Sequence, residues 1–342
     1  MNGRPLRNVR VISGLSAQTM PVAELIESGQ PAILRGVAND WPLVAKGRHS
    51  PQATIDYLAA FDGGQPVVGY TGPAEINGRF FYNEDITGMN FEAKRVGFRD
   101  FLRRIADRLD DNDAPSLYIG STDLETYLPG IGAENGVEND ALTAFAPTAS
   151  IWIGNRTTAS AHFDFSNNIA CNLVGRRRFT LFPPNQIHNL YPGPLAPTPG
   201  GQVVSMVDFS SPDFERFPRF QIALDAAQVA ELEPGDLLIY PAMWWHQVEA
   251  LDRFNVMINY WWNETPRFID SPMTTLLHAL LSLRDRPAGE KEAWRELFEY
   301  YVFGPPDVAR RHLPQHAQGP LGPMDEMTAR RLRAEALQRL NR

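Results

Sequence analysis

The sequence is poor in two features that often decide the class of a protein, namely cysteine and long apolar runs. Cys171 is the single cysteine in 342 residues, so no internal disulfide can form, and its setting in "IACNLV" indicates a small buried residue. No apolar run approaches the ~20 residues that a membrane span requires. The N-terminal "MNGRPLRNVRVISG" also lacks the apolar segment of a secretory signal. We therefore expect a cytoplasmic protein with no membrane partner.

Positively charged residues are also fewer than negatively charged ones. Lys and Arg number 32 against 40 Asp and Glu, which gives a net charge of −8. An acidic chain offers no electrostatic reason to bind nucleic acid, and we expect no such partner. The basic run "GRRRF" at 175–179 does not change this, because side chains on a strand alternate between two faces and divide the arginines between them.

Short apolar runs separated by turn residues dominate the first 265 positions. The 28 prolines and 26 glycines separate runs of strand length that are rich in β-branched and aromatic residues, such as "SIWIGN", "RFTLFPP", "GDLLIYP" and "FNVMINYWW". This pattern is typical of a sandwich or barrel. Helical periodicity interrupts it at 21–28 and 98–109, where the second segment carries one apolar stripe.

The pattern becomes helical after about residue 265. We expect helices over 271–286, 290–303 and 324–340, with a proline-rich loop at 304–323. The sequence thus predicts a domain over 1–265, with its core at about 115–265, and a C-terminal helical extension over 266–342. The first two of these helices carry more apolar residues than docking on a barrel needs. Either they form a homodimer interface, or they cap their own barrel.

A polar pair and a distant histidine carry the chemistry. In "TTASAHFDFSNN" at 157–168, His162 and Asp164 share one strand face, although such a pair is more often two ordinary polar residues. His246 follows Trp244 and Trp245, where burying an unpaired ring is costly, so it needs a partner: a metal ion or a backbone carbonyl. The remaining histidines show no ligand-like spacing and are expected to be structural or exposed: His49, His188, His278, His312 and His316.

The two segments resemble the two motifs of the cupin superfamily in their spacing. The second motif is matched by Gly235, Pro241 and His246, with Ala250 where an asparagine is usual. The first is matched by His162, Asp164, Asn168 and Gly175, and Asn168 replaces a glutamate ligand. Two histidines and one carboxylate leave three positions open on a metal ion. That set is used by non-haem Fe(II) oxygenases.

Longer motifs resemble the JmjC-type oxygenases, which depend on Fe(II) and 2-oxoglutarate. They are "AHFD", "FTLFPPNQIHNLYPGP", "VDFSSPDFERFPRF", "PGDLLIYPAMWWHQVEAL" and "NYWW". The resemblance is greatest to the asparaginyl hydroxylase that inhibits the hypoxia-inducible transcription factor, and to its bacterial cupin-like relatives. It implies a mainly β fold with helices: a double-stranded β-helix (jelly roll, cupin) with N-terminal α/β decoration and the C-terminal extension.

The same resemblance assigns roles to individual residues. It implies His162, Asp164 and His246 as the metal ligands and catalytic centre. It implies a cosubstrate pocket formed by Tyr118, Asn168, Arg177 and Asn259. Arg177 occupies the position of a lysine that binds the distal carboxylate of 2-oxoglutarate. The family's threonine is replaced by Ala159, so that either Thr158 or Ser160 would have to substitute for it.

Strand alternation supports the position of Arg177 independently. In "RRRFTLF", a period of two places Arg177, Phe179 and Leu181 on one face. An inward arginine among apolar residues requires an anion, unless its head extends to the barrel rim. Tyr118, in "SLYIG", is either a pocket residue or a core tyrosine.

These observations predict an Fe(II)- and 2-oxoglutarate-dependent dioxygenase. We expect it to hydroxylate a protein or peptide side chain or a small molecule, releasing succinate and CO2. Two alternatives stay open. One is a non-catalytic cupin-like protein that binds or senses a metal ion and a small acid, and the other is a metal-dependent isomerase on the same barrel. The substrate cannot be read from these motifs.

Overall fold

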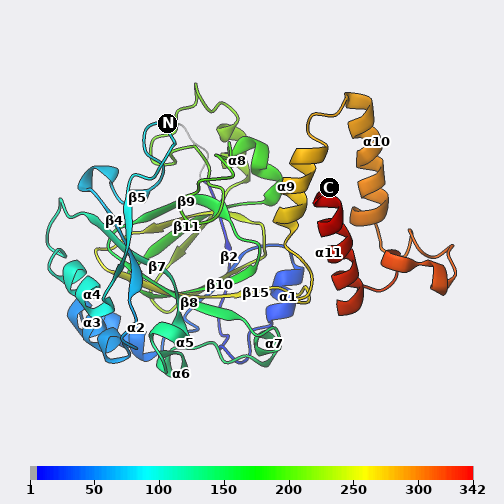
Figure 1. Ribbon diagram of the computed structural model, residues 1–342. Coiled ribbons are helices and arrows are strands. Elements are labelled where there is room, and N and C mark those ends of the chain that lie inside the picture. The colour runs from blue at the N-terminus through cyan, green and yellow to red at the C-terminus, as the bar shows by residue number, and fades with distance from the viewer. Residues whose placement is uncertain (1–5, 342) are drawn as a thin grey trace. The chain divides into compact units, whose positions relative to one another are not determined.

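The computed structural model describes residues 6–341 and divides into two compact units. The first ends at Asn263 and consists mainly of strands, whereas the second begins at Glu264 and is helical. Two sheets form the body of the first unit (Figure 1). The mainly β class predicted from the short apolar runs is therefore confirmed.

The smaller sheet has six strands and carries the residues of the metal motif. Its inner strands pair antiparallel, while the edge strands β1 and β5 pair parallel with their neighbours. The strand order, with bounds, is β1 (Arg7–Asn8), β12 (Gln228–Leu232), β11 (Arg177–Phe182), β14 (Trp245–Ala250), β9 (Thr158–Phe163) and β5 (Arg79–Phe80).

The larger sheet has nine strands and supplies the opposite wall. Its order, with bounds, is β2 (Arg10–Ile12), β3 (Ala32–Leu34), β13 (Leu237–Tyr240), β10 (Asn167–Val174), β15 (Asn255–Trp262), β8 (Thr148–Gly154), β7 (Ser116–Asp123), β4 (Val67–Gly72) and β6 (Glu92–Val96). β10 and β15 lie at its centre. The two sheets are mixed and open, as expected for a jelly roll with added N-terminal strands.

Strand β10 shows how this sheet divides the interior. Ile169 and Cys171 point to a large apolar core that they share with the helices, and Cys171 is fully buried, as predicted. Ala170, between them, belongs to the core that the two sheets enclose. Both faces of the strand are therefore buried, which explains its nearly continuous apolar sequence.

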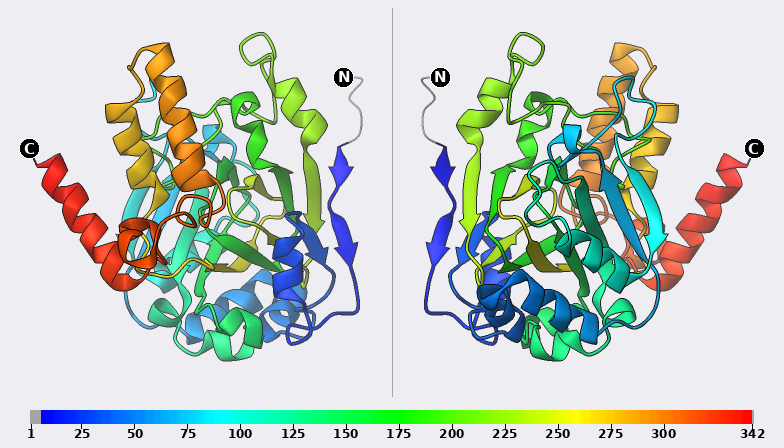
Figure 2. Two further views of the ribbon diagram at one scale, coloured as in Figure 1. Left: turned by 90° about the vertical axis from the view of Figure 1, so that its right-hand side faces the viewer. Right: turned by 90° about the vertical axis from the view of Figure 1, so that its left-hand side faces the viewer.

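Helices of the first unit cover the outer face of the nine-stranded sheet (Figure 2). Phe98, Phe101, Leu102 and Ile105 of the predicted amphipathic helix are buried, which confirms its apolar stripe, although the helix ends three residues earlier than predicted. These helices are α1 (Val22–Glu27), α2 (Pro42–His49), α3 (Pro51–Ala60), α4 (Phe98–Ala106), α5 (Leu124–Tyr127), α6 (Ile131–Glu134) and α7 (Asp140–Thr143), with a 3-10 turn at Ala74–Ile76. The helix α8 (Phe220–Ala226) and the 3-10 turn at Pro184–Asn189 lie elsewhere, and α8 packs on Phe182 and Trp245 of the six-stranded sheet.

The Pro-Gly-Asp turn before β13 has a structural role. Gly235 has φ +106, and a Cβ there would lie 2.3 Å from the Asn39 Oδ1. Asp236 is buried, forms an ion pair with Arg35, and accepts hydrogen bonds from the backbone N–H groups of Gly36 and Glu233. This carboxylate therefore fixes the turn that leads into the strands of the site.

The second unit contains three helices and a connecting segment. Ser271 caps the first helix through its side chain, as its position before Pro272 suggests. The helices are α9 (Pro272–Ser282), α10 (Ala288–Phe298), followed by a π turn at Glu299–Phe303, and α11 (Glu326–Leu340). The three predicted helices are confirmed within a few residues. Among residues 6–341, the structure contains no helix long and apolar enough to cross a membrane.

Candidate functional site

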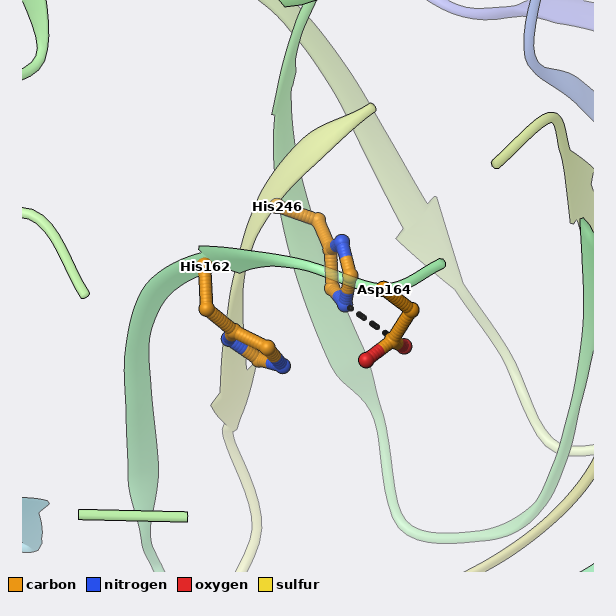
Figure 3. A group of neighbouring side chains, drawn as sticks. All are labelled: His162, Asp164 and His246. Carbon is orange, nitrogen blue, oxygen red and sulfur yellow. Dashed lines mark ion pairs between the residues drawn. The ribbon is translucent and has the colours of Figure 1, made fainter. Parts of the chain in front are cut away.

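His162, Asp164 and His246 lie together at the end of the six-stranded sheet (Figure 3). His162 in β9 and His246 in β14 are directly paired across the antiparallel ladder, and their ring centroids are 4.3 Å apart. Asp164 follows β9 and approaches His246 with 3.7 Å between its Oδ2 and the histidine Nε2. One potential ligand atom from each residue lies within 4.8 Å of the others, which suits a single metal ion.

The backbone fixes which nitrogen each histidine presents. Nδ1 of His162 lies 2.8 Å from the Ser160 carbonyl oxygen, and Nδ1 of His246 lies 3.0 Å from that of Trp244. A carbonyl only accepts, so each Nδ1 carries a proton and each Nε2 is the nitrogen left for a metal ion. Burial, followed by the neighbouring His162, lowers the pKa of His246 to about 4, so that it is neutral at pH 7. Nε2 of His246 therefore has the free lone pair that binds a metal ion.

Asp164 is oriented by a residue of the opposite sheet. The indole Nε1 of Trp261 donates a hydrogen bond of 3.3 Å to Oδ2 of Asp164. Tyr240, also from that sheet, packs its ring 5.0 Å from that of His246. Burial, followed by the charge of Asp164, raises the pKa of the Tyr240 hydroxyl, which therefore stays protonated.

The three residues open into a cavity of about 310 Å³ between the two sheets. Its wall combines aromatic side chains with hydroxyl and amide groups. The ring of Tyr118 stacks on those of Trp152 and Phe80, at 5.9 and 5.8 Å between centroids. Among the residues of this wall, Asp164 is the only one with a formal charge. Away from the triad, the wall therefore offers rings and neutral polar groups to a ligand.

Two asparagines of the predicted cosubstrate pocket line this cavity. Oδ1 of Asn259 accepts a hydrogen bond of 2.6 Å from the Trp152 indole. Nδ2 of Asn168 donates one of 2.8 Å to the Tyr240 hydroxyl, whereas its Oδ1 is buried without a partner. The Oδ1 atom of Asn168 thus accepts no hydrogen bond in this structure. A buried amide oxygen without a donor favours binding of a polar ligand.

Arg177 lies behind the wall, next to Tyr118. Its side chain is 4% exposed and its Nε has no hydrogen-bond partner. Burial lowers the pKa of this guanidinium to about 10, so it is still charged at pH 7. Arg177 in turn partly offsets the effect of burial, which raises the pKa of the Tyr118 hydroxyl. In contrast, its neighbours Arg176 and Arg178 pair with carboxylates at the surface, as strand alternation predicts.

The site also contains residues that sequence reasoning did not single out. Tyr240 and Trp152 line the cavity and bond the two asparagines, and they had no spacing signal of their own. Trp261, expected only as core or pocket wall, bonds a ligand residue. Thr158, Ala159 and Ser160 all line the cavity, and the Ser160 hydroxyl accepts a hydrogen bond from Arg79.

A family model described as "Cupin-like domain" matches residues 17–268. The chain belongs to this family. The match includes all three residues of the triad and the strands of both sheets except β1 and β2, which confirms the jelly-roll fold and the cupin-like family predicted from the motifs.

Curated relatives point in the same direction. Lysine-specific demethylase 8 of Xenopus tropicalis is 25% identical over 68% of this chain and 48% of its own length. Jumonji C domain-containing protein 5 of Drosophila melanogaster is 26% identical over 69% and 55%. HSPB1-associated protein 1 of Rattus norvegicus is 39% identical over a shorter region, 33% of this chain and 23% of that protein. The chain thus spans at most about half the length of these relatives. The predicted JmjC-type resemblance is confirmed.

Proposed function

We propose that this protein is an Fe(II)- and 2-oxoglutarate-dependent oxygenase. The observation that carries the proposal is Arg177, a buried cation with no acidic partner among residues 6–341, next to a cavity that holds two histidines and one carboxylate. A buried charge that lacks a counter-ion is costly, and an anionic ligand would supply one. The JmjC relatives support the same class.

The donor set fits Fe(II). Two imidazoles and one carboxylate on the same side of an ion leave positions for a chelating ligand and for O2. When bound, the iron would supply the activation of O2 that side chains cannot perform. The chain holds the ligands: Ser160 and Trp244 orient the two rings through their carbonyls, and Trp261 orients Asp164.

The cosubstrate fits the other end of the cavity. Its distal carboxylate would pair with Arg177 and accept a hydrogen bond from the Tyr118 hydroxyl, which stays protonated because burial raises its pKa. Asn168 and Asn259 line the same cavity as Tyr118 and the triad. The aromatic wall of the cavity would exclude water from the reacting atoms.

Hydroxylation of a protein side chain is the reaction that we propose, with N-methyl demethylation as the principal alternative. Demethylase names among the relatives favour the alternative, whereas the uncharged aromatic wall is compatible with either. A small-molecule substrate would use the same cavity.

Two measurements on the purified chain test the oxygenase. Anaerobic addition of Fe(II) and 2-oxoglutarate should produce a weak visible charge-transfer band, and admission of air should then produce succinate slowly without added substrate. A band without succinate would identify a binding or sensing protein instead. Absence of both would contradict the proposal, and an isomerase would require no 2-oxoglutarate.

We further propose a homodimer formed through the C-terminal helices. Several large apolar side chains of the second unit are exposed, among them Leu281 at 81% and Phe303 at 72%. Light scattering should give about twice the 38.3 kDa of the chain. Leu281→Glu with Phe303→Glu should give the monomer, while Leu195→Glu, an equally apolar change in the first unit, should not. A monomeric parent protein would leave the helices as a cap on their own barrel.

A further inference from the structure

A second hollow on the first unit is an open groove of about 710 Å³, which we call the arginine groove. It lies between the turn that contains Ile86 and the segment around Ile187 and Tyr191. Its apolar lining comes from these residues and Phe217, and two arginines, Arg216 and Arg219, complete it. No function discussed above uses this groove.

The two arginines are held in place by stacking and lack an anion. The guanidinium of Arg219 lies 4.5 Å from the centre of the Tyr191 ring, and its Nε donates a hydrogen bond to the His188 carbonyl. The guanidinium of Arg216 lies 5.1 Å from the centre of the Phe217 ring. In the described part of the chain, residues 6–341, neither forms an ion pair with a carboxylate. Ten of the 21 exposed arginines among these residues form an ion pair. What distinguishes Arg216 and Arg219 is that both line one groove and stack on its aromatic rings.

Backbone strain marks the same groove independently. Ile86 has φ +60 and Tyr191 has φ +49, in the left-handed region that β-branched and bulky side chains rarely adopt. Asn83 holds the turn of Ile86 by accepting a hydrogen bond from the Gly88 backbone N–H. Strained residues of this kind cluster at binding sites, because the surrounding structure must impose them.

A short hairpin joins the arginine groove to the cavity of the triad. The backbone N–H of Gly193 donates to the Val204 carbonyl at 2.8 Å, and that of Met206 donates to the Tyr191 carbonyl at 2.9 Å. Gly193 and Met206 line the groove, whereas Val204 and Gln202 line the cavity. The two hollows are therefore separated by little more than the two strands of this hairpin.

We propose that the arginine groove binds an acidic segment of a protein substrate whose reacting side chain lies in the cavity. The proposal rests on the oxygenase function and names its substrate class. Two planar guanidinium groups match carboxylates in a bidentate manner, and Ile86 and Phe217 would contact an apolar neighbour of the acidic residue. A small molecule that fits the cavity alone would not reach the groove, so the groove favours a peptide.

Fluorescence anisotropy of the full chain with two labelled decapeptides tests this inference. One peptide carries three glutamates and two leucines among glycines and serines, and the other has lysines in place of the glutamates. The acidic peptide should bind, and added salt should weaken it. The double variant Arg216→Glu with Arg219→Glu should bind the acidic peptide at least fivefold more weakly than the parent does. The same variant should bind the basic peptide more tightly than the parent does. The control, Arg7→Glu with Arg103→Glu, makes the same charge change on exposed residues of β1 and α4 and should bind like the parent.

Two results would overturn the proposal. One is that the parent and the groove variant bind the acidic peptide equally well. The other is that the parent does not bind it at millimolar concentration. If the double variant unfolds, the single variant Arg216→Ala takes its place, because it removes only a stacked surface side chain. It should weaken binding of the acidic peptide at least twofold. No metal or turnover is involved, so this outcome is separate from the succinate assay: a protein that binds the peptide through its arginines but forms no succinate would have the groove without the oxygenase function.

Discussion

The triad and Arg177 differ in how completely the protein satisfies their polar groups. At the triad, both Nδ1 atoms have carbonyl partners and Asp164 accepts a hydrogen bond from Trp261. Arg177, behind the cavity wall, is buried with its Nε unpaired. Among residues 6–341, Arg177 forms no ion pair with a carboxylate, whereas Oδ2 of Asp164 lies 3.7 Å from Nε2 of His246. The comparison indicates that the triad is preformed for a cation, while the surroundings of Arg177 are completed only by an anion.

Removing a triad residue should have the largest effect. Asp164→Ala deletes the only anionic ligand, so Fe(II) affinity should fall by more than the ~10–100-fold typical of residues that merely support ligands. Elemental analysis after dialysis against Fe(II) measures this. Asp208→Ala, which removes a carboxylate paired with Arg79 outside the triad, is the matched control. Full iron occupancy in Asp164→Ala would contradict the assignment.

Removing the charge of Arg177 should lower the affinity for 2-oxoglutarate alone. A charge-assisted hydrogen bond contributes roughly 1.5–3 kcal/mol, so Arg177→Met should weaken 2-oxoglutarate binding roughly ten- to a hundredfold. Fe(II) affinity should not change, and Arg177→Lys should be intermediate. Calorimetry measures both affinities.

Pyruvate provides the control for that variant, because it keeps the chelating 2-oxo acid but lacks the distal carboxylate. It should bind poorly, and equally, to the parent and Arg177→Met proteins. If both proteins bind 2-oxoglutarate equally well, Arg177 does not contact it.

Changing Trp261, which orients the Asp164 carboxylate, should lower Fe(II) affinity less than changing Asp164 itself. Trp261→Phe keeps the ring but removes the donor of a rather long hydrogen bond, so Fe(II) affinity should fall about tenfold, the lower end for a supporting residue. Trp262→Phe is the matched control, because its buried ring nitrogen has no partner to lose. Equal metal affinity in both variants would remove Trp261 from the site.

The smallest effect concerns stability. Without ligands, Arg177→Met replaces an uncompensated buried charge by an apolar side chain, so the melting temperature should rise by a few degrees, corresponding to roughly 1 kcal/mol. Saturating 2-oxoglutarate with a redox-inert metal should raise the melting temperature of the parent more than that of the variant. A variant that melts lower than the parent without ligands would indicate that Arg177 is already compensated.

The sequence predicted the parts of the site that depend on spacing within one segment. The spacing of His162 and Asp164 correctly placed them in one cluster, although Asp164 lies just after β9 and not on the strand. Alternation correctly buried Arg177 while exposing Arg176 and Arg178. His246 was found because its flanking tryptophans made burial costly. The helices were located by their apolar stripes. Their predicted ends are wrong by a few residues, because fraying and capping determine where a helix ends.

Residues whose role depends on the pairing of distant strands were missed. Tyr240 meets Asn168 only because β13 and β10 are neighbours in register, and Trp152 meets Asn259 through the pairing of β8 with β15. Neither register is encoded in local periodicity. The arginine groove was missed for the same reason, because its residues come from several separate regions of the chain, around residues 86, 187–194, 206 and 216–219, that each resemble ordinary loops.

The direct pairing of His162 with His246 has a mechanical consequence. An ion held by both would cross-link β9 and β14 at their ends, next to the register irregularity between His246 and Val248, where the ladder is weakest. Closing that end would slow the opening fluctuations that let backbone amides exchange with deuterium. Metal loading would then appear as slower exchange along these two strands, even with an ion that supports no chemistry.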